Sequence, residues 1–167
     1  LRSIITLALS QLDPAAVSQL IDRLGEPGDV ASRVALAHTL VRLRWSGGLQ
    51  HLGRVARDPA AEVRAVALRA LGRSVRPSGP PPDVLIDAVA QGLSDPDEVV
   101  RAAAVHLCSR KCLEHRAEGI RALLQNDPAR LVRQRAALAT GIMRAAGGET
   151  VLIAVSRQAE LLDLRAA

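Results

Sequence analysis

The chain has 167 residues, a length typical of one domain, and enough Leu, Val, Ile and Ala to bury a sizeable core. It contains no Phe, no Tyr and one Trp, which disfavours sheet sandwiches and favours closely packed helices. The formal net charge is +5, but Lys111 is the single lysine among 22 basic residues, so the positions of the arginines say more about a partner than the total charge does.

The first predicted element, an apolar segment over residues 2–12, is too short to span a bilayer and is interrupted by Thr6 and Ser10. The two cysteines of the chain lie four residues apart and give no disulfide framework, which fits a reducing compartment. We therefore expect a cytoplasmic chain without membrane contact. Because the sequence begins at Leu1 and not at Met, we expect residues 1–167 to form one domain within a longer protein.

Two kinds of amphipathic segment then alternate along the chain. In the first kind, apolar residues recur at helical spacing. Its copies lie within residues 17–24, 49–55, 85–93 and 120–124, and a further one is expected at 148–164. A proline-rich stretch, RPSGPPPD at 76–83, separates two of these units, and we expect it to be an irregular protruding loop.

The second kind of segment follows the pattern D-P-x-x-x-V-R, with strong copies from Asp58, Asp95 and Asp127 and a weaker one from Glu26. Asp supplies a side-chain cap and Pro suits a first helical turn, so we expect each Asp-Pro to start a helix. Apolar residues then recur at helical spacing, as in Val63, Ala67, Ala70 and Leu71. The repeating unit is therefore a pair of helices.

This pattern resembles the HEAT repeats, in particular the short bacterial form called the PBS-lyase type, whose hallmark is the helix D-P-x-x-x-V-R-x-x-A. The resemblance covers nearly the whole chain and implies an all-α fold, an α-solenoid or superhelix of stacked antiparallel helix pairs. We expect about four and a half repeats, with residues 2–12 as the second helix of an earlier unit. The second helices are expected to line the concave inner surface, as they do in the family.

The resemblance also implies a structural role for two columns of hallmark residues, which in the family tend to hydrogen-bond from one repeat to the next. The acidic column contains Asp58, Asp95 and Asp127. The basic column contains Arg64, Arg101 and Arg133. We expect these six residues to hold the stack together rather than to bind a ligand. The corresponding hallmark arginine of the weaker copy is Arg33.

Two further columns follow from helical geometry, at roughly 100° per residue. Counted from each hallmark arginine, position +5 is occupied by His38, Arg69, His106 and Leu138. Position +9 is occupied by Arg42, Arg73, Arg110 and Ile142, and position +12 adds Trp45 and Arg76. Three consecutive repeats thus place a basic or imidazole pair, one turn apart, on the face opposite the core.

This face has two interpretations. An arginine-rich protein has exposed arginines in any case, so the face could be solvated without binding anything. Charges in register instead favour an anion-binding groove, because Arg pairs well with carboxylate or phosphate. An acidic protein segment and the backbone of duplex DNA both have the required chemistry, but the lack of Phe and Tyr removes base-stacking platforms and disfavours single strands and RNA.

Leu138 and Ile142 break the basic columns with two apolar side chains one turn apart. Either they stay exposed and anchor a partner, or the segment at 148–164 folds back and buries them. We favour the exposed anchor, because 148–164 has its own apolar stripe suited to ordinary stacking.

Metal and catalytic sites are weakly indicated. Cys108, Cys112 and His115 could share one helix face, with His106 pointing elsewhere, but Cys108 occupies a core position and is more simply a buried apolar residue. The family's iron-dependent hydroxylases use His-Glu pairs, and none of the four histidines here precedes Glu. The family's DNA glycosylases use aromatic residues around an acidic group, but no carboxylate lies in register with Trp45. We also recognise no bilin pocket, no phosphate loop and no nucleophile motif. We expect no cofactor, no metal and no catalysis, and we expect a protein-binding scaffold, with duplex DNA binding as the alternative.

Overall fold

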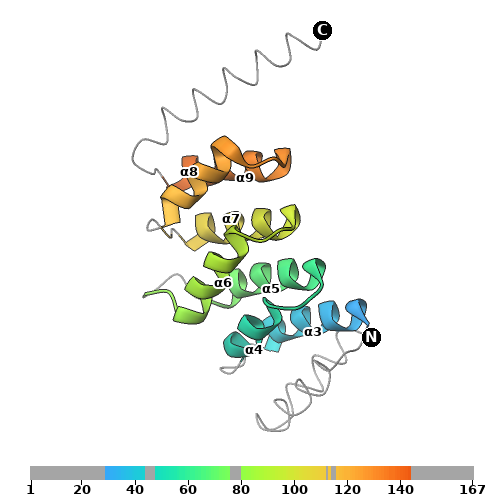
Figure 1. Ribbon diagram of the computed structural model, residues 1–167. Coiled ribbons are helices and arrows are strands. Elements are labelled where there is room, and N and C mark those ends of the chain that lie inside the picture. Colours follow the sequence, from blue (N-terminus) through green and yellow to red (C-terminus); the bar gives the residue numbers. More distant parts are fainter. Residues whose placement is uncertain (1–28, 44–47, 76–79, 112, 114–115, 144–167) are drawn as a thin grey trace.

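The computed structural model describes residues 29–43, 48–75, 80–111, 113 and 116–143 (Figure 1). Within these ranges the chain forms seven α-helices and no strand. They are α3 (Val30–Leu43), α4 (Gly48–Val55), α5 (Ala61–Ser74), α6 (Asp83–Leu93), α7 (Glu98–Lys111), α8 (Ala117–Asn126) and α9 (Arg130–Met143). The helices expected at 2–12, 17–24 and 148–164 lie outside the described residues, as does 76–79 of the expected loop.

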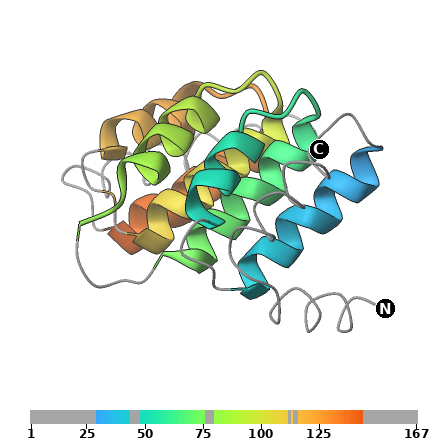
Figure 2. The same ribbon diagram turned by 90° about the horizontal axis from the view of Figure 1, so that it is seen from below.

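The helices form two layers (Figure 2). One layer contains α3, α5, α7 and α9, which we call the second helices, and each of them packs on the next. The other layer contains the first helices α4, α6 and α8, each packed on the second helix that follows it. The all-α stack of helix pairs is thus confirmed, with three complete pairs and the lone second helix α3 in the described part of the chain.

One hydrophobic core runs between the layers. The predicted stripe of α5 is fully buried, and its members Ala67, Ala70 and Leu71 lie in one cluster with Leu52, Leu85 and Val89 of the neighbouring first helices. Further along, Ile120 and Leu124 of α8 continue this cluster. Full burial of one such aliphatic side chain stabilises the fold by about 1.5–3 kcal/mol, so the continuous core is the main stabilising contribution.

The helix starts differ from the expected ones. We expected Asp to cap the helix and Pro to occupy its first turn, but α5 begins three residues after Asp58, and Ala60 occupies the capping position. Asp58 Oδ1 instead accepts the amide of Ala60 at 2.8 Å and closes a short turn before the helix. Asp95 and Asp127 make the same turn, with distances of 2.9 Å each.

In this turn the carboxylate of each Asp also faces the preceding repeat, where it accepts hydrogen bonds from a hallmark arginine. The distances from arginine Nε to Asp Oδ2 are 2.8 Å for Arg33–Asp58, 2.8 Å for Arg64–Asp95 and 2.7 Å for Arg101–Asp127. In all three pairs a second nitrogen donates to the other oxygen, so the pairs are bidentate. We call this series the Asp–Arg ladder, and it confirms the hydrogen bonding expected between repeats.

The ladder arginines also hold their own turns. Arg64 Nη1 donates to the carbonyl oxygens of Asp58 at 2.8 Å and Pro59 at 2.9 Å, and Arg101 and Arg133 repeat the arrangement. Burial would raise the pKa of Asp95, but the hydrogen bonds from Arg64 and from the amide of Asp97 outweigh it and hold that pKa below its usual value. Arg64 and Arg101 therefore have both their charge and their donors satisfied by protein groups.

Small residues let the second helices approach one another. Ala65 in α5 and Ala102 in α7 directly follow the hallmark arginines and are buried, although roughly 100° per residue turns this position toward the outward face. They are buried because they lie at the contact between neighbouring second helices, which a single helix does not reveal.

Among the described residues, no helix is both long and apolar enough to cross a membrane.

Candidate functional site

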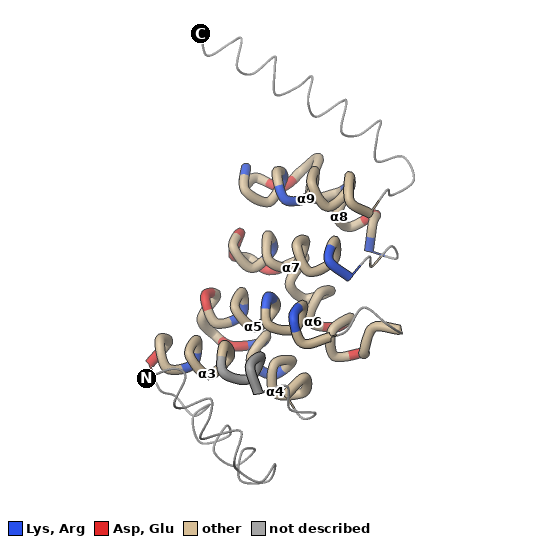
Figure 3. Tube along the Cα trace, turned by 180° about the vertical axis from the view of Figure 1, so that it is seen from behind, with Lys and Arg blue, Asp and Glu red and all other residues tan. Residues whose placement is uncertain are grey.

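The predicted columns lie on the outward side of the second helices. His38 of α3, Arg69 and Arg73 of α5, and His106 and Arg110 of α7 are all exposed. The side chain of Arg42 lies outside the described residues, as do Trp45 and Arg76. Basic residues recur along the traces of α5, α7 and α9 (Figure 3).

The columns meet in a small open pocket of about 90 Å³ between α5 and α7. Its charged lining is the predicted set, namely Arg69, Arg73, His106 and Arg110. The Asp–Arg ladder fixes the register of α5 against α7, and this register puts equivalent positions of neighbouring repeats side by side. The structure therefore brings these four predicted residues together, and the predicted register of the columns is correct.

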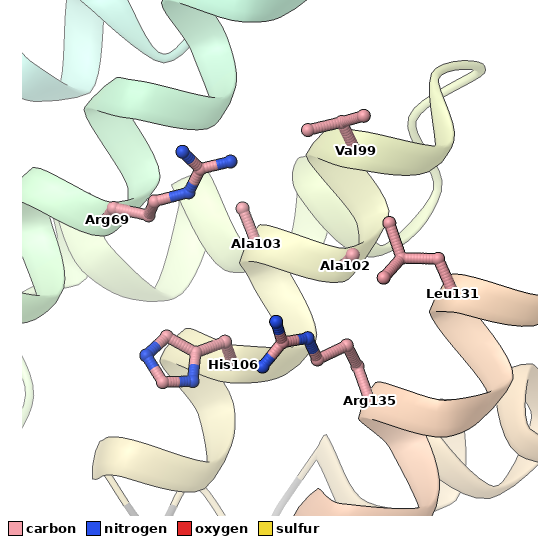
Figure 4. A pocket seen from close by; sticks show the side chains of 7 residues that line it. All are labelled: Arg69, Val99, Ala102, Ala103, His106, Leu131 and Arg135. Atoms are coloured by element: carbon pink, nitrogen blue, oxygen red, sulfur yellow. The ribbon is translucent and has the colours of Figure 1, made fainter.

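A larger open pocket of about 240 Å³ lies beside it, between α5, α7 and α9. Arg69 and His106 line both pockets, and Arg135 of α9 joins them here. Arg69 and Arg135 extend toward α7 from its two sides, over the small side chains of Ala102 and Ala103 (Figure 4). We call the surface formed by these two adjoining pockets the basic groove.

The apolar rim of the larger pocket consists of Val99 and Leu131, which are 40% and 37% exposed. Sequence reasoning missed both residues and also Arg135. Val99 and Leu131 each lie two residues before a hallmark arginine, and Arg135 lies two residues after one. At roughly 100° per residue, both offsets point to the same side of the helix as +5 and +9. The angular argument could therefore have found them, had it followed the face around more of the helix.

The electrostatic environment of the groove is strongly positive. Burial, followed by Arg110, Arg135 and Arg69, lowers the pKa of His106 below its usual value. The imidazole is therefore uncharged near neutral pH and can either donate or accept a hydrogen bond. Among the described residues that line the two pockets, none is acidic.

Leu138 and Ile142 are the most exposed large apolar residues of the described chain, each 61% exposed. Both lie in α9, on the same helix as Leu131 and Arg135. The end of the groove at α9 thus combines aliphatic side chains with a guanidinium, the mixture found at protein-binding surfaces.

The candidate metal cluster has little support. Cys108 is fully buried, and burial raises the pKa of its thiol to about 12, so the thiolate that a metal needs is disfavoured. Cys112 and His115 lie outside the described residues. No group of metal-ligating side chains occurs in the described part of the chain.

A further pocket, of about 260 Å³, lies between the first helices α4 and α6. Arg54 and Arg57 line one side, and Asp83 and Asp87 line the other. These opposite charges offset each other, whereas the charges of the basic groove do not. The basic groove is therefore the stronger candidate for binding a charged partner.

The comparisons with known proteins agree with this architecture. A search of curated proteins finds no match. The family described as HEAT repeats matches residues 49–141, more than half of the chain. This span includes three first helices, the Asp–Arg ladder from Asp58 onward and the two pockets of the basic groove. The chain therefore belongs to the HEAT repeat family.

Proposed function

We propose that this chain is a non-catalytic scaffold that binds an acidic segment of another protein in the basic groove. The observation that carries the proposal is the contrast between two sets of arginines. Those of the Asp–Arg ladder are paired with carboxylates. Arg69, Arg73, Arg110 and Arg135 have no such partner among the described residues, and they gather in two adjoining pockets.

The packing supports the view that this groove lies on the concave side. Neighbouring second helices pack extensively on one another, whereas neighbouring first helices make few contacts. A stack bends toward the layer whose members are closer together, so we expect the second helices to line the inside of the curve. A concave basic surface can contact a partner over several repeats at once.

The apolar residues of α9 favour a protein over duplex DNA. A phosphate backbone needs only positive charge, whereas a stable protein interface also needs apolar anchors near its centre. Leu138 and Ile142 supply such anchors beside the groove.

We further infer that the repeats are of the short bacterial PBS-lyase type, that residues 1–167 form one domain, and that the protein is cytoplasmic.

Fluorescence anisotropy tests the proposal with two probes, labelled poly-L-glutamate and a random duplex DNA, at about 0.15 M salt. The double variant Arg73→Gln/Arg110→Gln should bind poly-L-glutamate about tenfold more weakly, because it loses charge-assisted hydrogen bonds. Arg57→Gln/Arg130→Gln removes the same charge outside the groove and should bind as the wild type does. Tight binding of duplex DNA with a steep salt dependence would instead support the nucleic-acid alternative.

A further inference from the structure

The larger pocket of the basic groove has two chemically different ends. Val99 and Leu131 lie at one end, near the starts of α7 and α9. Arg135 follows Leu131 by one helical turn, and His106 follows Val99 by two (Figure 4). Arg69 reaches in from α5 over Ala103, across α7 from Arg135, and lines the same pocket. An apolar site and a cationic site are thus adjacent and in the same order along both helices.

The cationic end lacks an anion within the described protein. Ladder arginines such as Arg64 and Arg101 lie in bidentate pairs, but Arg69 and Arg135 face a pocket lined by no described acid. Two guanidinium groups that converge on one space repel each other until an anion neutralises them. A carboxylate between them would accept hydrogen bonds from both sides.

The size of the pocket limits what can occupy it. Its volume of about 240 Å³ is smaller than the roughly 300–1,000 Å³ of sites that enclose small-molecule ligands and cofactors. The pocket is also open to the groove on the surface. Side chains of a peptide lying in the groove fit this size and openness better than a free cofactor does.

We propose that this pocket recognises two neighbouring side chains of the partner protein, a carboxylate between Arg69 and Arg135 and an aliphatic side chain against Val99 and Leu131. The inference rests on the proposed function and narrows the class of partner, because an acidic segment without an aliphatic side chain would make only one of the two contacts. The partner segment must present a Glu or Asp beside a Leu, Ile or Val.

His106 makes this recognition dependent on pH. Arg69 faces it from α5, Arg110 from its own helix and Arg135 from α9, and Arg73 lines the adjoining small pocket. Burial and these arginines lower the pKa of His106 in the free protein. A bound carboxylate opposes the arginines and raises that pKa, so binding takes up protons. The affinity should therefore increase as the pH falls from about 7.5 to about 5.5, above the range in which glutamate itself is protonated.

The test uses three short peptides, acetylated and amidated at their ends, in which leucine alternates with glutamate, serine with glutamate, or leucine with glutamine. Titration of the isotope-labelled protein, followed by NMR at the backbone amides of Ala102 and Ala103, measures binding at the pocket. The leucine–glutamate peptide should bind about tenfold more tightly than either of the others, since each control lacks one of the two contacts. The affinity of both glutamate peptides should rise with falling pH, and that of the leucine–glutamine peptide should not, because it has no carboxylate to act on His106.

Matched variants separate the pocket from general charge. Arg135→Gln should weaken binding of the leucine–glutamate peptide about tenfold, whereas Arg130→Gln, which removes the same charge from the same helix outside the pocket, should not. Leu131→Ser should reduce binding of this peptide to the level of the serine–glutamate peptide. Because Arg135 and Leu131 are exposed, unchanged melting temperatures should accompany these losses.

Two results overturn the inference. If the leucine–glutamate and serine–glutamate peptides bind equally and Arg135→Gln behaves like Arg130→Gln, the two-site recognition is wrong. The proposed function then still stands if Arg73→Gln/Arg110→Gln weakens binding of poly-L-glutamate. If none of the peptides binds and duplex DNA does, the inference and the proposed function both fail.

Discussion

Arginine performs two opposite tasks in this protein, and the surroundings of each residue decide which one. Arg101 is only 12% exposed in its side chain and donates to both carboxylate oxygens of Asp127, while Arg69 is exposed and faces a pocket without a described acid. The hydrogen bond to Asp127 raises the pKa of Arg101. The arginines of the basic groove lie two, five or nine residues after a hallmark arginine, so the residues that hold the stack together are distinct from those proposed to bind a partner.

The ladder predicts a clear effect of Asp127→Asn. The asparagine keeps the size of the side chain and can still close the turn before α9, but it loses the charge that faces Arg101. Because Asp127 is 2% exposed in its side chain, we expect the free energy of unfolding to fall by about 2–3 kcal/mol. Chemical denaturation measures this change. The control is Asp87→Asn, at an exposed position in α6, which should change the free energy of unfolding by less than about 0.5 kcal/mol. Equal losses of stability in the two variants would contradict the role of the ladder.

The same pairs predict how stability depends on pH. The hydrogen bond from Arg101 lowers the pKa of Asp127 in the folded state, and the pKa of Asp95 is lowered as well. A lowered folded pKa gives stability that is complete above the unfolded value of about 3.9 and is lost as the pH falls through the folded value. Unfolding free energies measured from neutral pH downward should therefore decrease below about pH 4. Asp127→Asn should show a shallower acid decrease, and an equally steep one would exclude this source.

At the scale of the element, the packing of first against second helices depends on glycine. A Cβ atom on Gly92 of α6 would come within 2.9 Å of Ala104 in α7 and of Leu68 in α5. Gly92→Ala should therefore destabilise the protein by about 1–3 kcal/mol through overpacking, although alanine favours helix. Gly141→Ala is the matched control, because nothing lies within 4 Å of the new atom, and it should stabilise by about 0.5–1 kcal/mol in thermal or chemical unfolding. A stabilising Gly92→Ala would show that the two layers are looser than described.

The exposed end of α9 predicts a loss of binding without a loss of stability. Replacing Leu138 and Ile142 by Ser should leave the melting temperature unchanged, because each residue is 61% exposed, and should weaken binding of a protein partner. Calorimetry of the double variant and titration with the leucine–glutamate peptide measure the two effects. A destabilisation of about 2 kcal/mol or more would mean that another part of the chain covers these residues.

The repeat pattern allowed the element types and their order to be predicted, because these depend on spacing along each helix, and the resemblance to HEAT repeats implied hydrogen bonds between the Asp and Arg columns. It did not give the starts of the helices, since Asp58 and Ala60 compete for one cap and only the geometry of the turn decides between them. It also missed Arg135 and Leu131, which became part of a pocket only because three helices converge there. The contents of a surface pocket depend on distances between repeats, which spacing along the chain does not specify.

At the scale of the whole molecule, stability comes from contacts between neighbours. The core passes through every described pair of helices, and each ladder contact joins one repeat only to the next. The basic groove depends on the same stacking, because Arg69, His106 and Arg135 come from three successive second helices. A change that loosens one repeat interface should therefore weaken both the stack and the groove at that point.

The Asp–Arg ladder has a direction, because Arg64 and Arg101 each donate forward to the next Asp and backward to the turn before their own helix. Every internal contact is chemically the same, so Arg33 would find in Asp95 the acceptor it now has in Asp58 if residues 58–94 were removed. A stretch of the gene that spans one full period can thus be lost or duplicated and still leave every carboxylate matched. We therefore expect that the array can change its length in whole repeats during evolution, and with it the length of the basic groove.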